Sequence, residues 1–318
     1  MLSFHQIILY VAATLLRLVW FCVYGTPKAC PNRILHIPSR DPGRTIKVHI
    51  YDTTASLKKS PVLINLHGGA FVLPMHGGDD DFCHQVAGNT DYQVLDVQYR
   101  LAPEHPFPAA NEDVEDVVRW VLSRPDEFDL SQLSISGFGA GATLASIAAS
   151  VSFPKGTFRS LIAFYPATDF ANEITQKQPP GQFGSVIVPL LLRLLKQCYF
   201  QSTIDFKSPS ISPSFAMLDN FPRSVLMVTA ALDPLHYEAE ALAARLEATG
   251  KRNIVRYRAE RCDHGWDKTV APGSEQETAR DDAYDLAMEM LKNSRKVLLR
   301  PFQGNSRSSS FEDVSMAR

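Results

Sequence analysis

The stretch SISGFGAGATLA, residues 134–145, predicts a strand that enters a tight glycine-rich turn and leaves it as a helix. Three glycines stand at alternate positions of the turn, and alanine and leucine follow them. Glycine allows the backbone conformations that a sharp reversal needs, whereas alanine and leucine favour a helix. The stretch is therefore expected to be one strand–turn–helix unit.

The same order of strand and helix recurs along most of the chain. Apolar or alternating runs predict strands at 44–52, 61–69, 92–99, 160–166, 224–231 and 254–260, and amphipathic runs predict helices at 111–123, 236–250 and 274–294. Such alternation predicts an α/β fold, with a mostly parallel central sheet and helices on both faces.

Composition narrows the class of protein. A chain of 318 residues that is 45% hydrophobic can bury the core of one sizeable α/β domain or of two modest ones. The formal net charge of −2 and the scattered basic residues argue against a nucleic-acid partner. Five widely spaced cysteines without a C-x-x-C motif argue against a disulfide framework and favour a reducing compartment.

The N-terminal region, residues 1–33, contains an almost wholly apolar run at 7–24. Arg17 lies in the middle of this run, and Gln6, Tyr10 and Thr14 precede it at helical spacing to form one narrow polar stripe. The run fits two interpretations equally: a helix that packs over the domain as part of a cap, or a helix that contacts a membrane, either as an anchor or lying in the membrane surface. It is a poor signal peptide, so we expect a cytoplasmic, endoplasmic-reticulum or other membrane-associated location rather than secretion.

The rest of the chain is expected to form one main domain at 34–299. Within it, the segment 172–224 is rich in proline and irregular around one apolar helix, which predicts a cap inserted over the edge of the sheet. Residues 300–318 are polar and rich in serine, which predicts a disordered tail.

Five motifs follow one another in an informative order, and several of them fall where an expected strand ends. They are HGGA at 67–70, YRLAPEHPFPAA at 99–110, GFGAG at 137–141, LDPLHYEAEAL at 232–242 and CDHGW at 262–266. GFGAG differs from the G-x-S-x-G pattern of a nucleophile elbow only at its centre, where glycine replaces serine.

On these motifs the chain resembles the hormone-sensitive-lipase branch of the α/β-hydrolases, in its fungal esterase form, over residues 34–292. YRLAPEHPFPAA and its spacing to the later motifs carry most of the resemblance. It implies an α/β-hydrolase fold with a helical cap, and hydrolysis of carboxylic esters by serine, aspartate and histidine in that chain order. It places the acid at Asp233, the base at His264 and the position of the nucleophile at Gly139.

The resemblance also implies an oxyanion hole, formed by the loop of Gly68 and Gly69 and by the backbone N–H of Ala140. A serine hydroxyl is a weak nucleophile until a histidine takes its proton, and the histidine needs a carboxylate to fix its tautomer. Gly139 breaks this chain of proton transfer. Ser136 on the expected strand, Thr143 one helical turn further on and Cys262 beside the base are not convincing replacements.

Three functions remain open at this point. The chain descends from a carboxylic-ester hydrolase acting on a small hydrophobic ester such as a lipid or secondary metabolite, and Gly139 silences it. Alternatively, the pair of His264 and Asp233 serves a different reaction as a general base. In the third, the chain is a binding protein without activity, as is a plant hormone receptor of the same branch that has lost a different member of its triad.

No cofactor is expected. His76, His84 and His105 are too dispersed in the sequence to predict a zinc cluster, and the HGG loop lacks the lysine of a P-loop. The expected partners are a small hydrophobic ester or metabolite and, through residues 7–24, a membrane. The oligomeric state is left open.

Overall fold

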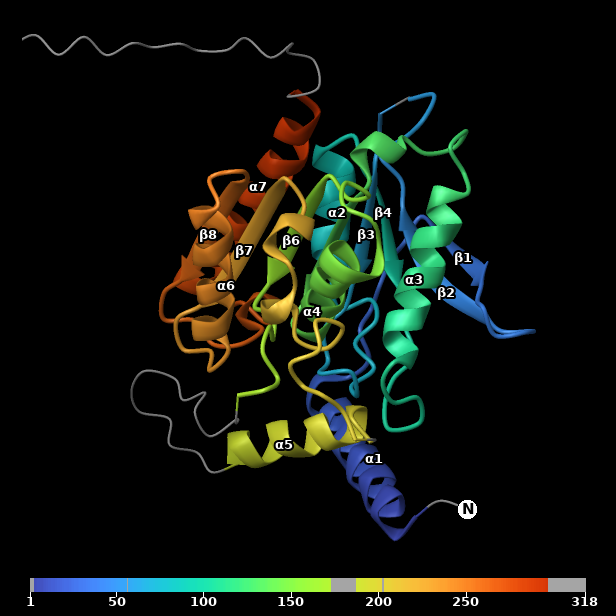
Figure 1. Cartoon of the computed structure of the whole chain (residues 1–318), viewed down its shortest axis with the longest axis vertical. Helices are drawn as coiled ribbons and strands as arrows, with labels where there is room; N and C mark the ends of the chain where they lie inside the picture. The colour runs from blue at the N-terminus through green and yellow to red at the C-terminus, as the bar shows by residue number, and fades with distance from the viewer. Residues whose placement is uncertain (1–2, 56, 173–186, 202, 297–318) are drawn as a thin grey trace, which may run out of the picture.

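The computed structural model describes residues 3–55, 57–172, 187–201 and 203–296. Its centre is one eight-stranded sheet in the order β1-β2-β4-β3-β5-β6-β7-β8, whose strands spread across Figure 1 from β8 on the left to β1 on the right. The strands are β1 Arg33–Pro38, β2 Thr45–Tyr51, β3 Val62–Leu66, β4 Gln93–Val97, β5 Ser134–Phe138, β6 Ser160–Phe164, β7 Ser224–Ala230 and β8 Asn253–Ala259. Strand β2 pairs antiparallel with both of its neighbours, and the pairs from β4 to β8 are parallel.

Helices cover both faces of the sheet. The described α-helices are α1 Phe4–Tyr24, α2 Asp80–Asn89, α3 Ala109–Leu122, α4 Ala140–Ile147, α5 Ile187–Tyr199, α6 His236–Ala248 and α7 Glu275–Lys296, and all of these except α1 and α5 lie on the two faces. One apolar core lies under α3, α4 and α6, and a second lies under α2 and α7. The predicted mostly parallel sheet with helices on both faces is therefore confirmed.

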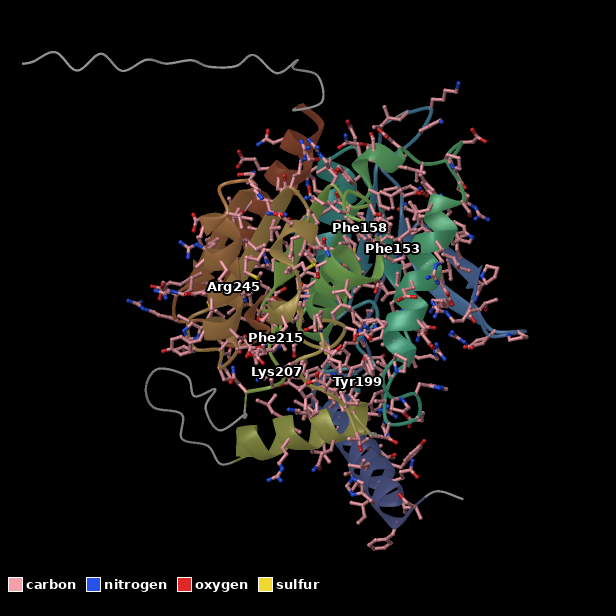
Figure 2. The ribbon with its side chains drawn as sticks, in the orientation of Figure 1. Phe153, Phe158, Tyr199, Lys207, Phe215 and Arg245 are labelled. Carbon is pink, nitrogen blue, oxygen red and sulfur yellow. The ribbon has the colours of Figure 1, made fainter. Side chains whose placement is uncertain are left out.

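Helices α1 and α5 pack against each other beyond one end of the sheet, at the bottom of Figure 1. Tyr199 ends α5 close to α1 (Figure 2). Helix α5 falls in the segment 172–224, where a cap was expected. That segment is described only in part, and the expected tail at 300–318 lies outside the described residues.

Two elements were not expected from the sequence. Strand β1 is mostly exposed, so its sequence lacks the pattern of a strand with one buried apolar face. It forms because it pairs with β2 along its whole length. Helix α2, with the sequence DDFCHQVAGN, is mostly polar and ends in residues that disfavour helix. Its Phe82, Cys83 and Val86 are buried beneath it, so contacts with the sheet and α7 stabilise it.

The turn between β5 and α4 depends on close backbone contacts. A Cβ atom on Gly141 would overlap the carbonyl oxygens of Leu66 and His67, and one on Gly137 would overlap the backbone of Gly141. The first turn of α4 therefore lies directly against the end of β3. Only glycine fits at these two positions, and this contact sets where Gly139 stands.

We predict that Gly141→Ala destabilises the fold by about 1–3 kcal/mol or more, because the new methyl group must displace the backbone of β3. Urea unfolding followed by circular dichroism measures the change. Gly88→Ala in α2 is the matched control, since a Cβ there meets no atom within 4 Å. Alanine should gain up to about 1 kcal/mol at that helical position. Equal stability of the two variants would contradict the proposed contact.

Candidate active site

Asp233 and His264 come together at the ends of β7 and β8. The His264 Nδ1–H donates to Asp233 Oδ2 at 2.7 Å, and the Leu235 backbone N–H donates to Asp233 Oδ1 at 2.8 Å. Asp233 is 1% exposed, whereas the side chain of His264 is 45% exposed. Both oxygens of the Asp233 carboxylate thus accept hydrogen bonds, and the carboxylate fixes the orientation of the His264 imidazole at the surface of a cavity.

The proton on His264 Nδ1 leaves Nε2 as the basic nitrogen of the neutral ring. Two opposing effects act on the pKa of His264. Burial of the ring, which packs edge-on to Tyr165 at 4.7 Å, favours the neutral form, whereas the charge and hydrogen bond of the Asp233 carboxylate favour the imidazolium. The carboxylate has the larger effect in sum, so the pKa of His264 is raised above its ordinary value. His264 is therefore available as a base only above that raised pKa.

Gly139 stands directly opposite the basic nitrogen. Its backbone has φ +50° and ψ −114°, a conformation that side chains rarely adopt, and its N–H donates to Phe164 O at 2.9 Å. A Cβ atom built on Gly139 would lie 3.1 Å from His264 Nε2. The structure therefore brings Gly139, Asp233 and His264 together. The imidazole of His264 lies between the Asp233 carboxylate and the side-chain position that glycine leaves empty.

The loop of Gly68 and Gly69 lies close to position 139, since a Cβ on Gly68 would lie 3.4 Å from the carbonyl oxygen of Phe138. The carbonyl of Gly68 accepts hydrogen bonds from His67 Nδ1 at 2.7 Å and from the Tyr99 hydroxyl at 3.3 Å. Since the peptide is trans, the N–H of Gly69 points away from these two donors. Gly69 has φ +107°, and a Cβ there would lie 2.5 Å from Leu73 O, so the loop requires glycine.

A largely apolar cavity of about 210 Å³ opens at Gly139, Ala140 and His264. Helix α5 forms one wall with Leu192, Leu195, Lys196 and Tyr199, and the loop that follows Gly68 and Gly69 contributes Ala70 and Phe71. The rings of Phe71 and Tyr199 stack with centroids 3.9 Å apart, which joins cap and loop. Sequence reasoning did not single out these residues, because two segments more than 100 positions apart form the wall.

The three other candidate nucleophiles are engaged elsewhere. The hydroxyl of Ser136 donates to Asn65 Oδ1 at 2.9 Å, and that of Thr143 donates to Ala167 O at 2.8 Å. Cys262 is buried, and burial raises the pKa of its thiol to about 11. None of the three offers a reactive group to the cavity.

A network of hydrogen bonds and ion pairs fixes the segment that follows His264 to the rest of the domain. Asp267 accepts hydrogen bonds from the hydroxyls of Tyr165 at 2.7 Å and Tyr284 at 2.9 Å. Lys268 Nζ lies 2.9 Å from Asp267 and 2.7 Å from Asp79. Burial lowers the pKa of Lys268, but the two carboxylates outweigh it and hold that pKa above its ordinary value. The CDHGW motif predicted His264 but not this support.

Comparison with known proteins agrees with this geometry. Residues 63–268 match the family model described as alpha/beta hydrolase fold. The chain therefore belongs to the α/β-hydrolase family, as the hormone-sensitive-lipase-like motifs implied.

Individual relatives are ester hydrolases. The chain is similar to an ethyl acetate hydrolase of Pseudomonas putida, with 29% identity over 223 residues, 68% of this chain and 70% of that one. It is 31% identical over 211 residues to the carboxylic ester hydrolase LipN of Mycobacterium tuberculosis, across 62% of this chain and 55% of that one. A hyperthermophilic esterase from the archaeon Pyrobaculum calidifontis superposes with a TM-score of 0.73 and 26% identity, covering 90% of this chain and 94% of that one. The chain is thus of the esterase type.

We predict that Asp233→Asn lowers the pKa of His264, because the variant removes the charge that raises it. Titration of the His264 ring by NMR measures the shift. Asp263→Asn is the matched control: its carboxylate raises the same pKa, but less than Asp233 does. An unchanged midpoint in the Asp233 variant would show that the pair is not coupled in solution.

Proposed function

We propose that the cavity binds a small hydrophobic carboxylic ester, and that glycine in place of serine at position 139 is what blocks hydrolysis through an acyl intermediate. One observation supports the proposal most directly: a Cβ atom at position 139 would lie 3.1 Å from His264 Nε2. A serine hydroxyl reaches one bond beyond Cβ, so it would lie within hydrogen-bonding range of the base.

The chemistry of a serine form follows from the positions of its partners. His264 would take the hydroxyl proton through Nε2 while Asp233 stabilises the imidazolium. The alkoxide would attack the ester carbonyl, and the N–H groups of Gly69 and Ala140 would receive the oxyanion. Loss of the nucleophile from such a triad lowers turnover by about 10⁶. As it stands, the chain should bind the ester and barely cleave it.

The cavity limits the size of the bound group. Its volume of about 210 Å³ is below the roughly 300–1,000 Å³ of drug-sized sites, which favours a short acyl chain over a long one. Phe71, Phe170 and Leu195 give it an apolar lining. An ester of acetate or butyrate is therefore a suitable probe.

We predict that Gly139→Ser hydrolyses p-nitrophenyl acetate and butyrate at least about 10³-fold faster than the unaltered chain. Gly139→Ala is the matched control, because it adds the same backbone strain at φ +50° without a hydroxyl. The rate should rise with pH through the raised pKa of His264, since only the neutral ring accepts the proton. Equal rates in serine and alanine variants would overturn the assignment of position 139.

The retained pair of Asp233 and His264 favours a second candidate, in which His264 Nε2 activates a water or a substrate hydroxyl in the space left by glycine. Turnover by the unaltered chain that His264→Ala abolishes would support this reaction. A ligand that stays bound and unchanged over hours would support a binding protein instead.

We also propose that the outer face of helix α1 lies on a lipid surface. Such a surface would be a source of hydrophobic ligands for the cavity. Among the described helices, α1 alone is long and apolar enough to cross a membrane, with a mean hydropathy of 2.1 and only 11% of its most apolar stretch buried. Its inner side is docked, because Leu9 and Ala13 are buried and α5 packs against it. A helix held along one side fits a position in the membrane surface better than one across it.

Arg17 and Thr14, two polar residues within the apolar run of α1, have hydrogen-bond partners inside the molecule. Arg17 donates to the carbonyl oxygens of Val72 and Ala102 and to both carboxylate oxygens of Glu104. The Thr14 hydroxyl donates to Tyr10 O at 2.8 Å. The exposed apolar side chains of the outer face are Phe4, Ile7, Ile8, Val11, Leu15, Leu18, Val19, Phe21, Val23 and Tyr24. This inverts the usual pattern of a solvent-facing helix, whose outer side is polar.

We predict that Leu15→Glu weakens sedimentation of the chain with phosphatidylcholine vesicles by about tenfold or more, because burial of a leucine contributes about 1.5–3 kcal/mol. Ile34→Glu is the matched control, since Ile34 is another exposed apolar side chain but lies on β1. Failure of the unaltered chain to bind vesicles, together with dimers on size-exclusion chromatography, would assign the face to a second copy instead.

A further inference from the structure

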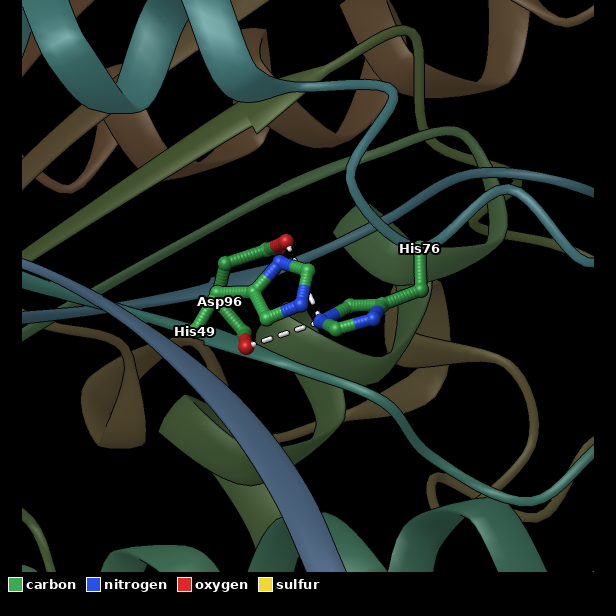
Figure 3. Close-up of side chains that lie close together, drawn as sticks. All are labelled: His49, His76 and Asp96. Atoms are coloured by element: carbon green, nitrogen blue, oxygen red, sulfur yellow. Dashed lines mark hydrogen bonds and ion pairs between the residues drawn. The ribbon is translucent and has the colours of Figure 1, made fainter. Parts of the chain in front are cut away.

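A buried cluster of two histidines and one aspartate lies outside the candidate active site (Figure 3). His49 on β2 and Asp96 on β4 are direct partners across the antiparallel pair. His76 reaches them from the loop that follows Gly69, and its Nε2 lies 3.3 Å from Asp96 Oδ2. One potential ligand atom from each residue lies within 4.8 Å of the other two. Three distant parts of the sequence thus converge on one point.

One polar atom of the cluster has no partner. His49 Nδ1 is buried without a hydrogen bond among the described residues, and Asp96 Oδ2, equally buried, has only its 3.3 Å contact with His76 Nε2 there. Asp96 is 0% exposed and His49 is 6% exposed, so water does not reach them freely. A native interior rarely leaves such atoms unmatched, and a bound ion is one of the few ways to satisfy both at once.

Further carboxylates lie close to the cluster. Asp79, Asp96 and Asp267 are buried, and Lys268, whose side chain is 16% exposed, pairs with Asp79 and Asp267. Asn65 links Asp79 to Asp96 by donating a hydrogen bond to each at 3.0 Å. A divalent cation beside Asp96 would interact favourably with its carboxylate and offset the cost of burying that charge.

We propose that His49, His76 and Asp96 form a binding site for a zinc ion. Two imidazoles and one carboxylate are donors that zinc accepts in proteins. Zinc holds such donors at about 2.0–2.2 Å, so the three atoms must draw together when the ion enters. His76 stands on a loop and can make that movement. Asp96 Oδ1 is already fixed by Asn65, which leaves Oδ2 for the metal.

The position of the site gives it a structural role. Zinc would tie β2 and β4 to the loop that begins at Gly68 and Gly69. The same loop ends near Asp79, which pairs with Lys268 below His264. The ion would therefore stiffen the oxyanion loop without touching a bound ester, and His76 and Asp96 would act as positioning residues.

The test is zinc uptake by the full chain after treatment with a chelator and dialysis. We expect one zinc per chain by calorimetry and elemental analysis, a rise in Tm with zinc, and intense visible absorption bands when cobalt(II) replaces it. His76→Ala and Asp96→Asn should each lower zinc affinity at least tenfold. Asp96→Asn is the more conservative change, because it preserves the shape of the side chain, and circular dichroism checks that both variants fold.

His84→Ala is the matched control. His84 is an exposed histidine on α2 with its own carboxylate neighbour, Asp80, at 3.8 Å. Its loss should leave zinc uptake unchanged. Absence of uptake by the folded chain, or equal uptake by the His76, Asp96 and His84 variants, would overturn the proposal. The result is independent of ester binding, because the same uptake is expected with glycine or serine at position 139.

Discussion

The contact of Gly141 with the backbone of β3 is the constraint on which the rest of the structure depends. Where a side chain would stand, the carbonyl oxygens of Leu66 and His67 lie against the first turn of α4. This close approach places the end of β3 and the end of β5 side by side. The HGG loop follows β3 and position 139 follows β5, so the pairing of these strands and the contact of α4 with the end of β3 bring the parts of the site together.

The sequence predicted those parts of the molecule that short stretches determine. Buried parallel strands appear as continuous apolar runs, and glycine at fixed spacing marks the turn. Asp233 and His264 were predicted because each stands in a recognisable motif. By contrast, β1, the wall of Phe71 and Tyr199, and the cluster of His49 with Asp96 depend on contacts between distant segments. No local pattern announces them.

Under the proposed function, glycine at position 139 leaves the site without a nucleophile while the surrounding residues keep their places. The backbone there retains a conformation with φ +50°, which costs strain for any other residue and little for glycine. Glycine thus relaxes the turn, while buried Asp233 still holds and orients the half-exposed ring of His264. A histidine held in this way has no structural need for a nucleophile opposite it, which explains how the geometry persists without one.

The N-terminal helix is coupled to the site through one side chain. Arg17 donates to the carbonyl of Val72, three residues beyond Gly69, and to that of Ala102 in the YRLAPEHPFPAA motif. Because Glu104 neutralises the guanidinium, the helix can carry an arginine in an apolar run and still present an uncharged outer face. These hydrogen bonds tie α1 to the loop that follows Gly69 and to the YRLAPEHPFPAA segment, so the N-terminal helix is held against the part of the chain that also borders the cavity.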